Sequence, residues 1–406
     1  MSEKQNPKVK ITCRNVWKVF GPRPEQALEL IKDTMTKDKI LDETGHVLAV
    51  KNVSFNVYEG EVFVVMGLSG SGKSTLVRCL NGLIKPTRGQ IIIDGTDLDS
   101  MDKTELRMVR RHKISMVFQH FALFPHRTIL DNAAYGLELQ KIEKSKRYER
   151  ALEVLDLVGL KGWEKSYPEE LSGGMQQRVG LARALVLDPE ILLMDEAFSA
   201  LDPLIRRQMH DEFIKLIARV RKTIVFISHD LNEAMRLGSR IAMMKDGEIE
   251  QIGTPEEIVC APGSDYVRDF IRDISRDKII KVKTIMKEPS SSLKDSLELE
   301  TALRIIKGEQ RDQIFVTNSK GEFIGAINSI DIDKGLASKY IKLDEIAINK
   351  TFQIGPDQTI EKLLPIMAVC DNTVAVVDKS RKLIGEVSRV VLLQAILGKE
   401  NSDGTE

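Results

Sequence analysis

VVMGLSGSGKSTLVRCL, residues 64–80, passes from an apolar run through a turn of small residues into a stretch of helical spacing. Residues 67–74 fit the pattern G-x-x-x-x-G-K-[ST], between an expected strand and a helix expected to begin near Thr75. Glycines let the backbone wrap phosphate oxygens, and a helix N-terminus adds partial positive charge. A chance glycine-rich turn would explain the pattern but not its position between strand and helix. The stretch therefore predicts a phosphate-binding loop.

Each polar residue of this loop has an expected role. Lys73 would reach the β- and γ-phosphates of a nucleotide, and the Ser74 hydroxyl would bind Mg²⁺. The other loop residues expected to contact the nucleotide are Gly67, Ser69, Gly70, Gly72 and Thr75.

Length and composition limit the class of protein. A chain of 406 residues is expected to form two or three compact units. Its 60 basic and 60 acidic residues balance, so no global field favours nucleic acid, and no nucleic-acid partner is predicted. No apolar segment suggests a signal peptide or a membrane span, so membrane contact is expected through a partner or a surface. The cysteines are too far apart for a zinc or disulfide framework and fit a reducing cytosol: Cys13, Cys79, Cys260 and Cys370.

Between about residues 10 and 275, continuous apolar runs alternate with segments of helical period. Such runs predict the strands of a parallel sheet that helices cover on both faces. The clearest runs are residues 62–66, 114–118, 191–194 and 223–228. Before this sheet, an insertion of about residues 22–49 is expected to form one or two short charged helices on the solvated surface.

Polar residues follow three of the expected strands. Asp195 and Glu196 end one apolar run, which places two carboxylates beside the phosphate loop. Asp195 suits a metal shell, and Glu196 suits a general base, whose loss typically costs about 10²–10⁴-fold in rate. His229 ends a second run; a histidine is more commonly structural, but this position favours contact with the γ-phosphate and water. Gln119 ends a third run and is available to Mg²⁺ and water.

The segment LSGGMQQRVGLARAL, residues 171–185, predicts a second anion site. Ser172 can cap a helix, and Gly173 and Gly174 leave its first amides bare. One apolar face is expected along that helix: Met175, Val179, Ala182 and Val186. One chain thus carries two phosphate-binding ends, more than a single nucleotide needs.

Taken together, residues 11–275 resemble the nucleotide-binding subunit of an ABC transporter. The matching motifs are the A-loop (Phe20), Walker A (67–75), Q-loop (Gln119), signature (171–175), Walker B (191–196), D-loop (199–202) and H-loop (His229). One departure is Ala197, where proline often follows the glutamate in this family.

The resemblance implies a fold and a set of partners. The expected fold is a P-loop α/β nucleotide-binding domain with a helical subdomain at about residues 120–187. ATP and Mg²⁺ are the implied cofactors, and Phe20 would stack on adenine. Two copies would form a head-to-tail dimer, in which each copy closes the site around the ATP held by Lys73 of the other. It would supply Ser172 and Gly174, and Gly173 and Asp202 are further residues expected to contact the nucleotide.

The apolar segment 120–132, HFALFPHRTILDN, follows Gln119. In the family, this region receives the coupling helix of the membrane subunit. Phe121, Leu123 and Phe124 are the expected contacts, while burial of some of them within the helical subdomain is the alternative.

The chain beyond residue 275 has shorter elements, an expected loop at residues 290–296 and a repeat at an offset of about 60 residues. Residues 316–332 align with residues 376–392 as strand, turn, strand and helix. The repeat resembles a tandem of CBS modules, an α+β regulatory region over 276–398 with copies at about 280–336 and 343–398. Residues 399–406 are expected to be a disordered tail.

Neither copy completes the ribose-binding pattern G-x-x-[ST]-x-x-D of the CBS family. The first copy has Gly325, Asn328 and Asp331, and the second has Gly385, Ser388 and Val391. Two interpretations remain open: a cyclic dinucleotide at a dimer interface, or a purely structural dimerisation module.

The insertion, the segments 66–75 and 192–206 and the C-terminal duplication together resemble the ATPase subunit of glycine betaine/proline importers. This implies a peripheral protein on the cytoplasmic side of the cell membrane. It would drive uptake of a quaternary amine through a separate permease that carries a substrate-binding domain. The alternatives are an ATPase for another small solute, a soluble ABC ATPase without a transport role, and a nucleotide sensor.

An importer that serves volume regulation is expected to respond to ionic strength. Lysines near an anionic membrane surface contribute about 1 kcal/mol each, and salt screens that attraction. The candidates are Lys334, Lys339 and Lys342; a solvated basic face is the other interpretation.

Overall fold

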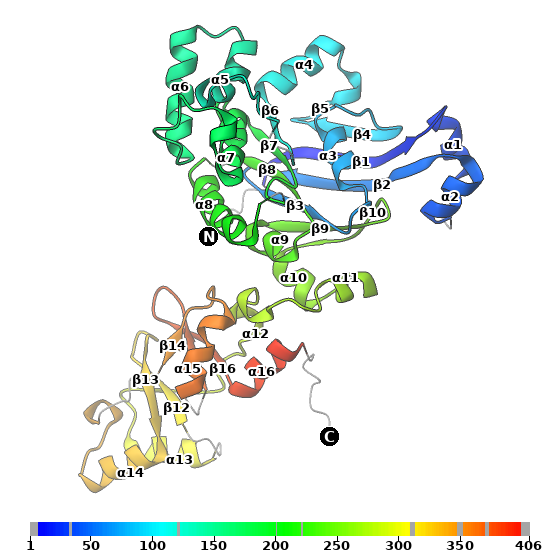
Figure 1. Cartoon of the computed structure of the whole chain (residues 1–406). Helices are drawn as coiled ribbons and strands as arrows, with labels where there is room; N and C mark the ends of the chain where they lie inside the picture. The colour runs from blue at the N-terminus through cyan, green and yellow to red at the C-terminus, as the bar shows by residue number, and fades with distance from the viewer. Residues whose placement is uncertain are drawn as a thin grey trace. The chain divides into compact units, whose positions relative to one another are not determined.

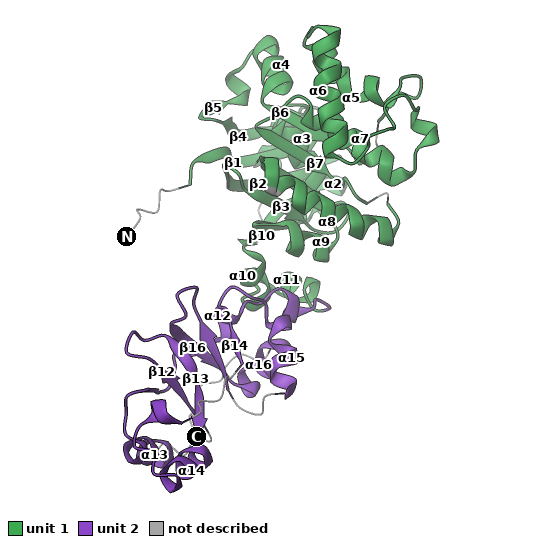
Figure 2. Ribbon diagram, turned by 90° about the vertical axis from the view of Figure 1, so that its left-hand side faces the viewer, with its two compact units in different colours: residues 1–272 green, residues 273–406 purple. Residues whose placement is uncertain are grey.

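The structure, a computed structural model, describes residues 7–31, 35–119, 122–199, 201–220, 222–308, 313–346, 352–369 and 373–398. The chain divides into two compact units, residues 1–272 and 273–406, called here the N-terminal and C-terminal units (Figure 2). The expected tail 399–406 and Phe121 lie outside the described residues.

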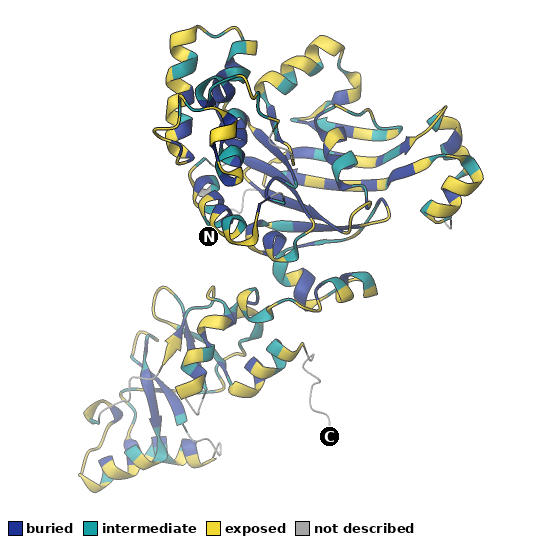
Figure 3. Ribbon diagram, in the orientation of Figure 1, coloured by how far each residue is buried: buried dark blue, intermediate teal, exposed yellow. Residues whose placement is uncertain are grey.

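A six-stranded sheet of order β10-β9-β3-β8-β7-β6 forms the centre of the N-terminal unit (Figure 1). Its strands are β3 (Val62–Met66), β6 (Ile114–Val117), β7 (Ile191–Asp195), β8 (Thr223–Ser228), β9 (Arg240–Lys245) and β10 (Glu248–Gly253). All neighbouring pairs are parallel except β9 with β10. Every residue of β3, β7 and β8 is buried (Figure 3). The prediction of a parallel sheet covered on both faces is therefore confirmed.

A second, antiparallel sheet of order β2-β1-β4-β5 was not expected from the sequence. Its strands are β1 (Val9–Phe20), β2 (Val47–Tyr58), β4 (Arg88–Ile93) and β5 (Thr96–Asp97). The charged insertion contains α1 (Pro24–Leu30) and α2 (Lys37–Thr44) and connects β1 to β2. It therefore joins two paired strands and does not simply precede the parallel sheet.

Helix α3 (Lys73–Leu80) packs in a core that contains residues of both sheets. Leu76, Val77 and Leu80 share one buried cluster with Ile91 of β4 and Val225 of β8. This burial fixes the first turn of α3 at the carboxyl end of β3. The cluster also contains Cys13 and Cys79. Burial raises the pKa of both thiols, that of Cys79 to about 12, so neither is a reactive thiolate.

The remaining helices of the N-terminal unit flank these sheets. Three of them pack against one another as a helical subdomain (Figure 1): α5 (Ile129–Leu139), α6 (Lys144–Leu157) and α7 (Gly173–Leu185). The others are α4 (Lys103–His112), α8 (Pro203–Val220), α9 (Leu231–Leu237), α10 (Pro255–Cys260) and α11 (Asp265–Phe270). The expected single apolar face of α7 was too narrow, because Gln177, Gly180, Leu181 and Ala184 are buried as well as Val179 and Ala182. A helix inside a subdomain contacts neighbours on several sides.

The C-terminal unit contains two three-stranded sheets, β11-β12-β13 and β14-β15-β16. Their strands are β11 (Ser292–Lys294), β12 (Gln313–Thr317), β13 (Phe323–Asn328), β14 (Gln353–Ile354), β15 (Val374–Val377) and β16 (Leu383–Val387). The helices are α12 (Val282–Ile285), α13 (Leu299–Gly308), α14 (Ser329–Ala337), α15 (Leu364–Val369) and α16 (Arg389–Leu397). The expected loop at 290–296 is wrong in part, because Ser292–Lys294 pairs with β12.

The two sheets have the same register. Val316 lies opposite Gly325 in the first, and Val376 lies opposite Gly385 in the second, with a register shift directly after each valine.

Within the described residues, each helix of the chain is too short or too polar to cross a bilayer.

Candidate active site

The predicted phosphate loop joins β3 to α3, which begins at Lys73, two residues before the expected start. Gly67 and Gly72 have φ values of 154° and 104°. A Cβ on Gly67 would lie 2.0 Å from the backbone oxygen of Met244, and one on Gly72 would lie 2.1 Å from that of Ala49. Only glycine fits at these positions, because the neighbouring atoms belong to backbone.

A pocket of about 580 Å³ lies over this loop. It brings together nine of the residues predicted from the sequence: Phe20, Ser69, Gly70, Gly72, Lys73, Ser74, Thr75, Gln119 and Glu196. Residues of α2 also line it, which the sequence did not indicate. The pocket has an apolar end at Phe20, Leu41 and Val47 and a polar end at the loop.

The side chain of Lys73 is buried in the loop. Its Nζ donates hydrogen bonds to the backbone oxygens of Gly67 and Leu68, both at 2.9 Å. Burial lowers the pKa of this ammonium, although Glu196 and Asp195 act in the opposite direction. A phosphate beside Lys73 would compensate the cost of burying its charge.

Ser74 and Asp195 form a polar pair at the end of β7. The Ser74 Oγ donates to Asp195 Oδ1 at 2.8 Å, and the Arg78 guanidinium lies 3.8 Å from Oδ2. Burial raises the pKa of Asp195 despite both contacts. A desolvated carboxylate beside a hydroxyl is a donor set that fits a hard divalent cation. Within the described residues, no group of three or more His, Cys, Asp or Glu side chains is placed to hold a metal ion.

Glu196 lies where the ends of three parallel strands meet. Its Oε2 is 3.3 Å from Gln119 Nε2 and 3.3 Å from His229 Nδ1. The Glu196 backbone has φ 48°, a left-handed conformation that is uncommon for residues other than glycine. Its N–H donates to the backbone oxygen of Ile227 at 3.1 Å, which helps to hold this conformation. The Gln119 and His229 side chains therefore converge on the Glu196 carboxylate, whereas Gln119 was also expected in the metal shell.

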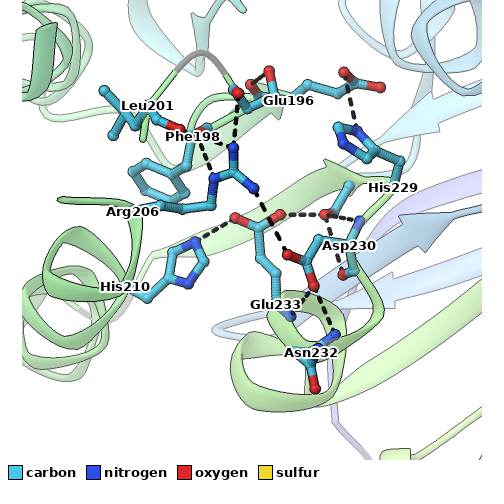
Figure 4. A network of polar contacts seen from close by, with 11 residues as sticks. Glu196, Phe198, Leu201, Arg206, His210, His229, Asp230, Asn232 and Glu233 are labelled. Atoms are coloured by element: carbon cyan, nitrogen blue, oxygen red, sulfur yellow. Dashed lines mark hydrogen bonds and ion pairs between the residues drawn. The ribbon is translucent and has the colours of Figure 1, made fainter. Parts of the chain in front are cut away.

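Arg206 is a site residue that the sequence reasoning missed (Figure 4). Its guanidinium donates to the backbone oxygens of Phe198, Ser199 and Leu201 at 3.1, 3.0 and 2.8 Å. It also lies 3.9 Å from Asp230 Oδ2, directly after His229. Arg206 thus connects the loop after Glu196 to the loop after His229. Its place at the end of the segment 192–206, which carries part of the family resemblance, was the available signal.

A buried polar network supports the same two loops. His210 Nε2 lies 2.5 Å from Glu233 Oε1, and the other Glu233 oxygen accepts a hydrogen bond from Ser228. Ser228 is the last residue of β8, so the network holds the strand end from which His229 projects (Figure 4).

The residues predicted for the second anion site, and Asp202, lie on other elements. Ser172 is the N-cap of α7 and accepts from the Met175 N–H at 3.4 Å. Gly174 packs closely, because a Cβ there would lie 2.7 Å from the Ile205 side chain. Asp202 accepts from the N–H groups of Leu204 and Ile205, both at 3.1 Å. Within the described part of the chain, neither the start of α7 nor Asp202 lines the pocket that contains Lys73.

Part of the apolar segment after Gln119 packs internally. The Phe124 ring centroid lies 4.6 Å from that of Tyr135, and the Phe124 N–H donates to Asn132 Oδ1 at 2.8 Å. Leu123 is also partly buried. Phe124 therefore packs in part against α5 of its own subdomain, in agreement with the alternative given for this segment.

Comparison with known proteins assigns the family. Residues 50–199 match the ABC transporter family. The chain is 47% identical over 391 residues to the glycine betaine/proline betaine transport system ATP-binding protein of Escherichia coli, covering 96% of this chain and 98% of that protein. It is 48% identical over 409 residues to the glycine betaine transport ATP-binding protein of Bacillus subtilis, covering 100% and 97%.

A solved structure supports the fold of the N-terminal unit. It is a dimeric post-hydrolysis state of an ATP-binding cassette bound to ADP and Pi, with a TM-score of 0.51 and 35% identity. The match covers 60% of this chain and 98% of that chain. The chain therefore belongs to the ABC transporter family, among the ATP-binding subunits of quaternary-amine osmolyte importers.

Proposed function

We propose that this chain hydrolyses Mg-ATP to drive uptake of glycine betaine or a related quaternary amine through a separate permease. The observation that carries the proposal is the convergence of Gln119 and His229 on the Glu196 carboxylate, beside the pocket that holds Lys73. Full-length similarity to glycine betaine transport proteins supports the substrate class.

Each side chain of the site has its own role in the proposed hydrolysis of ATP. Lys73 binds the terminal phosphates, and Glu196 accepts a proton from the attacking water. Gln119 and His229 orient that water and the carboxylate, since each lies 3.3 Å from Glu196 Oε2. Phe20 at the apolar end of the pocket stacks on adenine.

Ser74 and Asp195 are the residues that would hold Mg²⁺. Mg²⁺ in such sites takes one or two protein oxygens together with substrate phosphates, which fits a single buried carboxylate next to a hydroxyl. Bound there, it would neutralise negative charge on the phosphates. Gln119 is the further ligand proposed from the sequence.

Two copies act together in the proposed mechanism. Ser172 and Gly173 are exposed at the start of α7, a helix N-terminus suited to a phosphate, and Gly174 beside them is buried; none of the three lines the pocket of its own chain. A head-to-tail dimer would bring this helix, with Asp202, over the ATP bound to the other copy. The dimeric cassette bound to ADP and Pi supports this arrangement.

The permease is proposed to contact the helical subdomain from the cytoplasmic side of the membrane. A groove of about 250 Å³ there is lined by Phe118, Tyr135, Arg183 and Leu187, among others. Its mixture of aromatic, apolar and basic side chains suits a short helix of a membrane subunit. The permease is further proposed to carry the substrate-binding domain.

The C-terminal unit is proposed to be a tandem CBS regulatory module. In the ribose pattern, Asn328 replaces the residue that carries the hydroxyl, and Ser388 keeps it. The Asn328 side chain instead caps α14, and the Ser388 side chain caps α16. The α16 side chains Val390, Leu393 and Leu397 are exposed at helical spacing. These observations favour dimerisation as the main role, with a cyclic dinucleotide at the interface as the second candidate.

A basic segment of the C-terminal unit is proposed to touch anionic lipid. Lys334, Lys339 and Lys342 are exposed, and so are Tyr340 and Ile341 between them. Lysines next to an exposed aromatic and an aliphatic residue suit a membrane interface that salt would weaken. Neighbouring Asp333 and Asp344 reduce the net charge, so only a modest affinity is expected.

The test is uptake of glycine betaine by the chain and its permease in liposomes. Glu196→Gln is expected to bind ATP with normal affinity while hydrolysis and uptake fall about 10²–10⁴-fold. Glu153→Gln, an exposed glutamate on α6, is the matched control and is expected to behave as the unmodified chain. Near-normal hydrolysis by Glu196→Gln would contradict the role of Glu196, and transport of other solutes alone would contradict the substrate class.

A further inference from the structure

The charged insertion reaches the nucleotide pocket. Phe20 and Val47 lie opposite each other in the β1–β2 pair, and the insertion is the connection between them. Lys37, Asp38 and Leu41 of α2 line the pocket together with the phosphate loop. The expectation of a merely solvated surface insertion is therefore wrong for this helix.

Helix α2 is firmly attached to the sheet beneath it. Thr36 caps its first turn, and Gly45 ends it in a left-handed conformation. Ile40 is fully buried in a cluster with Val19 and Leu48 of the two strands. Because Lys37 and Leu41 are one turn apart, they share a face of this anchored helix.

Lys37 approaches the phosphate loop directly. Its Nζ donates to the backbone oxygen of Gly70 at 3.0 Å. Within the described residues, no carboxylate forms an ion pair with it, and Asp246 acts only at longer range. Burial lowers the pKa of this ammonium, as it does for Lys73. An ammonium has three donors, so two remain for an anion while one holds Gly70.

The polarity of the pocket decides which part of a nucleotide Lys37 would meet. The exposed apolar side chains Phe20, Leu41 and Val47 mark the end that suits a base. Ser69 to Thr75 form the end that suits phosphates, and Gly70 belongs to that end. Lys37 therefore lies on the phosphate side.

We propose that Lys37 is a second phosphate-binding lysine, supplied by the insertion, which contacts the phosphates of the ATP bound in this pocket. The inference rests on the proposed function, because it takes this pocket as the ATP site. The competing explanation is structural: Lys37 would only tie α2 to the loop through Gly70. A charge contact and a tether differ in their response to salt and to replacement by arginine.

The experiment measures ATP affinity of the purified full-length chain by titration calorimetry at several salt concentrations. Lys37→Gln is expected to raise the Kd for Mg-ATP about tenfold and to make its salt dependence shallower, since one cation is lost. Lys37→Arg keeps the charge and is expected to remain within about threefold of the unmodified chain. The control, Lys39→Gln, changes an exposed lysine of the same helix that pairs with Glu43, and no change is expected.

Two results would overturn the inference: unchanged affinity in Lys37→Gln, or a weakened affinity whose salt dependence is unchanged and that arginine does not restore. A thermal melt checks that each variant is folded. Lys73→Ala separates this inference from the proposed function. If Lys73→Ala binds ATP normally, the pocket is not the ATP site and both fail; if only Lys37→Gln binds normally, the inference alone fails.

Discussion

Ser74 and Asp195, 121 positions apart in the sequence, are joined by a hydrogen bond of 2.8 Å between the Ser74 Oγ and Asp195 Oδ1. The bond connects the first turn of α3 to the last residue of β7. It places the two proposed Mg²⁺ ligands side by side at the polar end of the pocket.

Asp195→Asn is expected to remove the Mg²⁺ dependence of ATP binding and to lower hydrolysis at least about 100-fold, because an amide is a poor ligand for a hard cation. Ser74→Ala is expected to act in the same direction. The measurement is ATP affinity with Mg²⁺ and with a chelator. The control is Ser115→Ala in β6, which removes a buried hydroxyl that has no hydrogen-bond partner among the described residues, and it should leave both properties intact. An Asp195→Asn variant that still responds to Mg²⁺ would exclude Asp195 as a ligand.

A mixed dimer tests whether Ser172 acts on the other copy. The two variants are Lys73→Ala and Ser172→Arg, and each chain also carries Glu196→Gln. A dimer made of either variant alone is expected to occlude no ATP. In a head-to-tail dimer of one copy of each, one site contains both changes and the other contains neither. Co-expressed chains are therefore expected to occlude one ATP per dimer. If Ser172 served its own chain, both sites would be damaged and none would be occluded.

Arg206→Lys is expected to lower ATP hydrolysis about 10–100-fold while ATP affinity changes less than about threefold. A lysine cannot reproduce the three hydrogen bonds to Phe198, Ser199 and Leu201, so the loop after Glu196 would shift, and small misplacements at a site are costly. Steady-state hydrolysis and nucleotide titration provide the two values. The exposed neighbour Arg207 serves as the control, as Arg207→Lys. Equal losses in the two variants would contradict a specific role for Arg206.

Gly72→Ala is expected to lower the thermal midpoint by several degrees and to weaken ATP binding more than about tenfold. Its Cβ would lie 2.1 Å from the Ala49 backbone oxygen, at a φ of 104°. Gly45→Ala separates collision from backbone strain, because Gly45 has φ 69° but nothing within 4 Å of its Cβ. That control is expected to cost only about 1 kcal/mol and to leave ATP binding unchanged. If both variants lost stability and ATP affinity to a similar extent, the left-handed backbone conformation, and not the collision with Ala49, would be the cause.

Protonation of Asp94 is expected to destabilise the fold at acid pH. Burial disfavours its charge, but Lys10 and Lys113, at 2.7 and 2.9 Å, outweigh burial and hold the pKa of Asp94 below its ordinary value of 3.8. A lowered pKa means that this stabilisation is present above the ordinary pKa and is lost as the pH falls through the folded-state value. Asp94→Asn is therefore expected to be about 1–3 kcal/mol less stable at pH 7, with the difference narrowing below about pH 4.

Urea unfolding between pH 7 and pH 3 measures this difference. Glu43→Gln breaks an exposed pair with Lys39 and is the control, expected to change stability by less than about 0.5 kcal/mol. If the free energies of unfolding of Asp94→Asn and of the unmodified chain differed by the same amount across the pH range, the ion-pair explanation would be contradicted.

Local patterns in the sequence were enough to predict the strands that carry the site. A parallel strand that is covered on both faces is mostly apolar, so β3, β6, β7 and β8 are visible in the sequence as largely apolar runs. The carboxyl ends of parallel strands meet at one edge, which is why Gln119, Asp195, Glu196 and His229 could be grouped from their positions alone. Glycine spacing likewise indicated the phosphate loop.

Other features depend on contacts between distant residues, for which no local pattern exists. The antiparallel sheet arises from pairings such as Phe20 with Val47 and Cys13 with Ile91. Arg206 became a site residue through bonds to backbone oxygens, which every sequence offers equally. The strand at Ser292–Lys294 is short and rich in polar residues, and its parallel pairing with β12 alone makes it a strand.

The sequence by itself determined the parallel sheet, the phosphate loop and the set of polar residues at the strand ends, because each follows from residue types at short spacing. Tertiary structure alone decided that Lys37 of a charged insertion lies beside Gly70 and that Arg206 links two loops of the site. The physical reason is that burial and backbone conformation leave a periodic trace in the chain, whereas hydrogen bonds between distant residues leave none until the chain has folded.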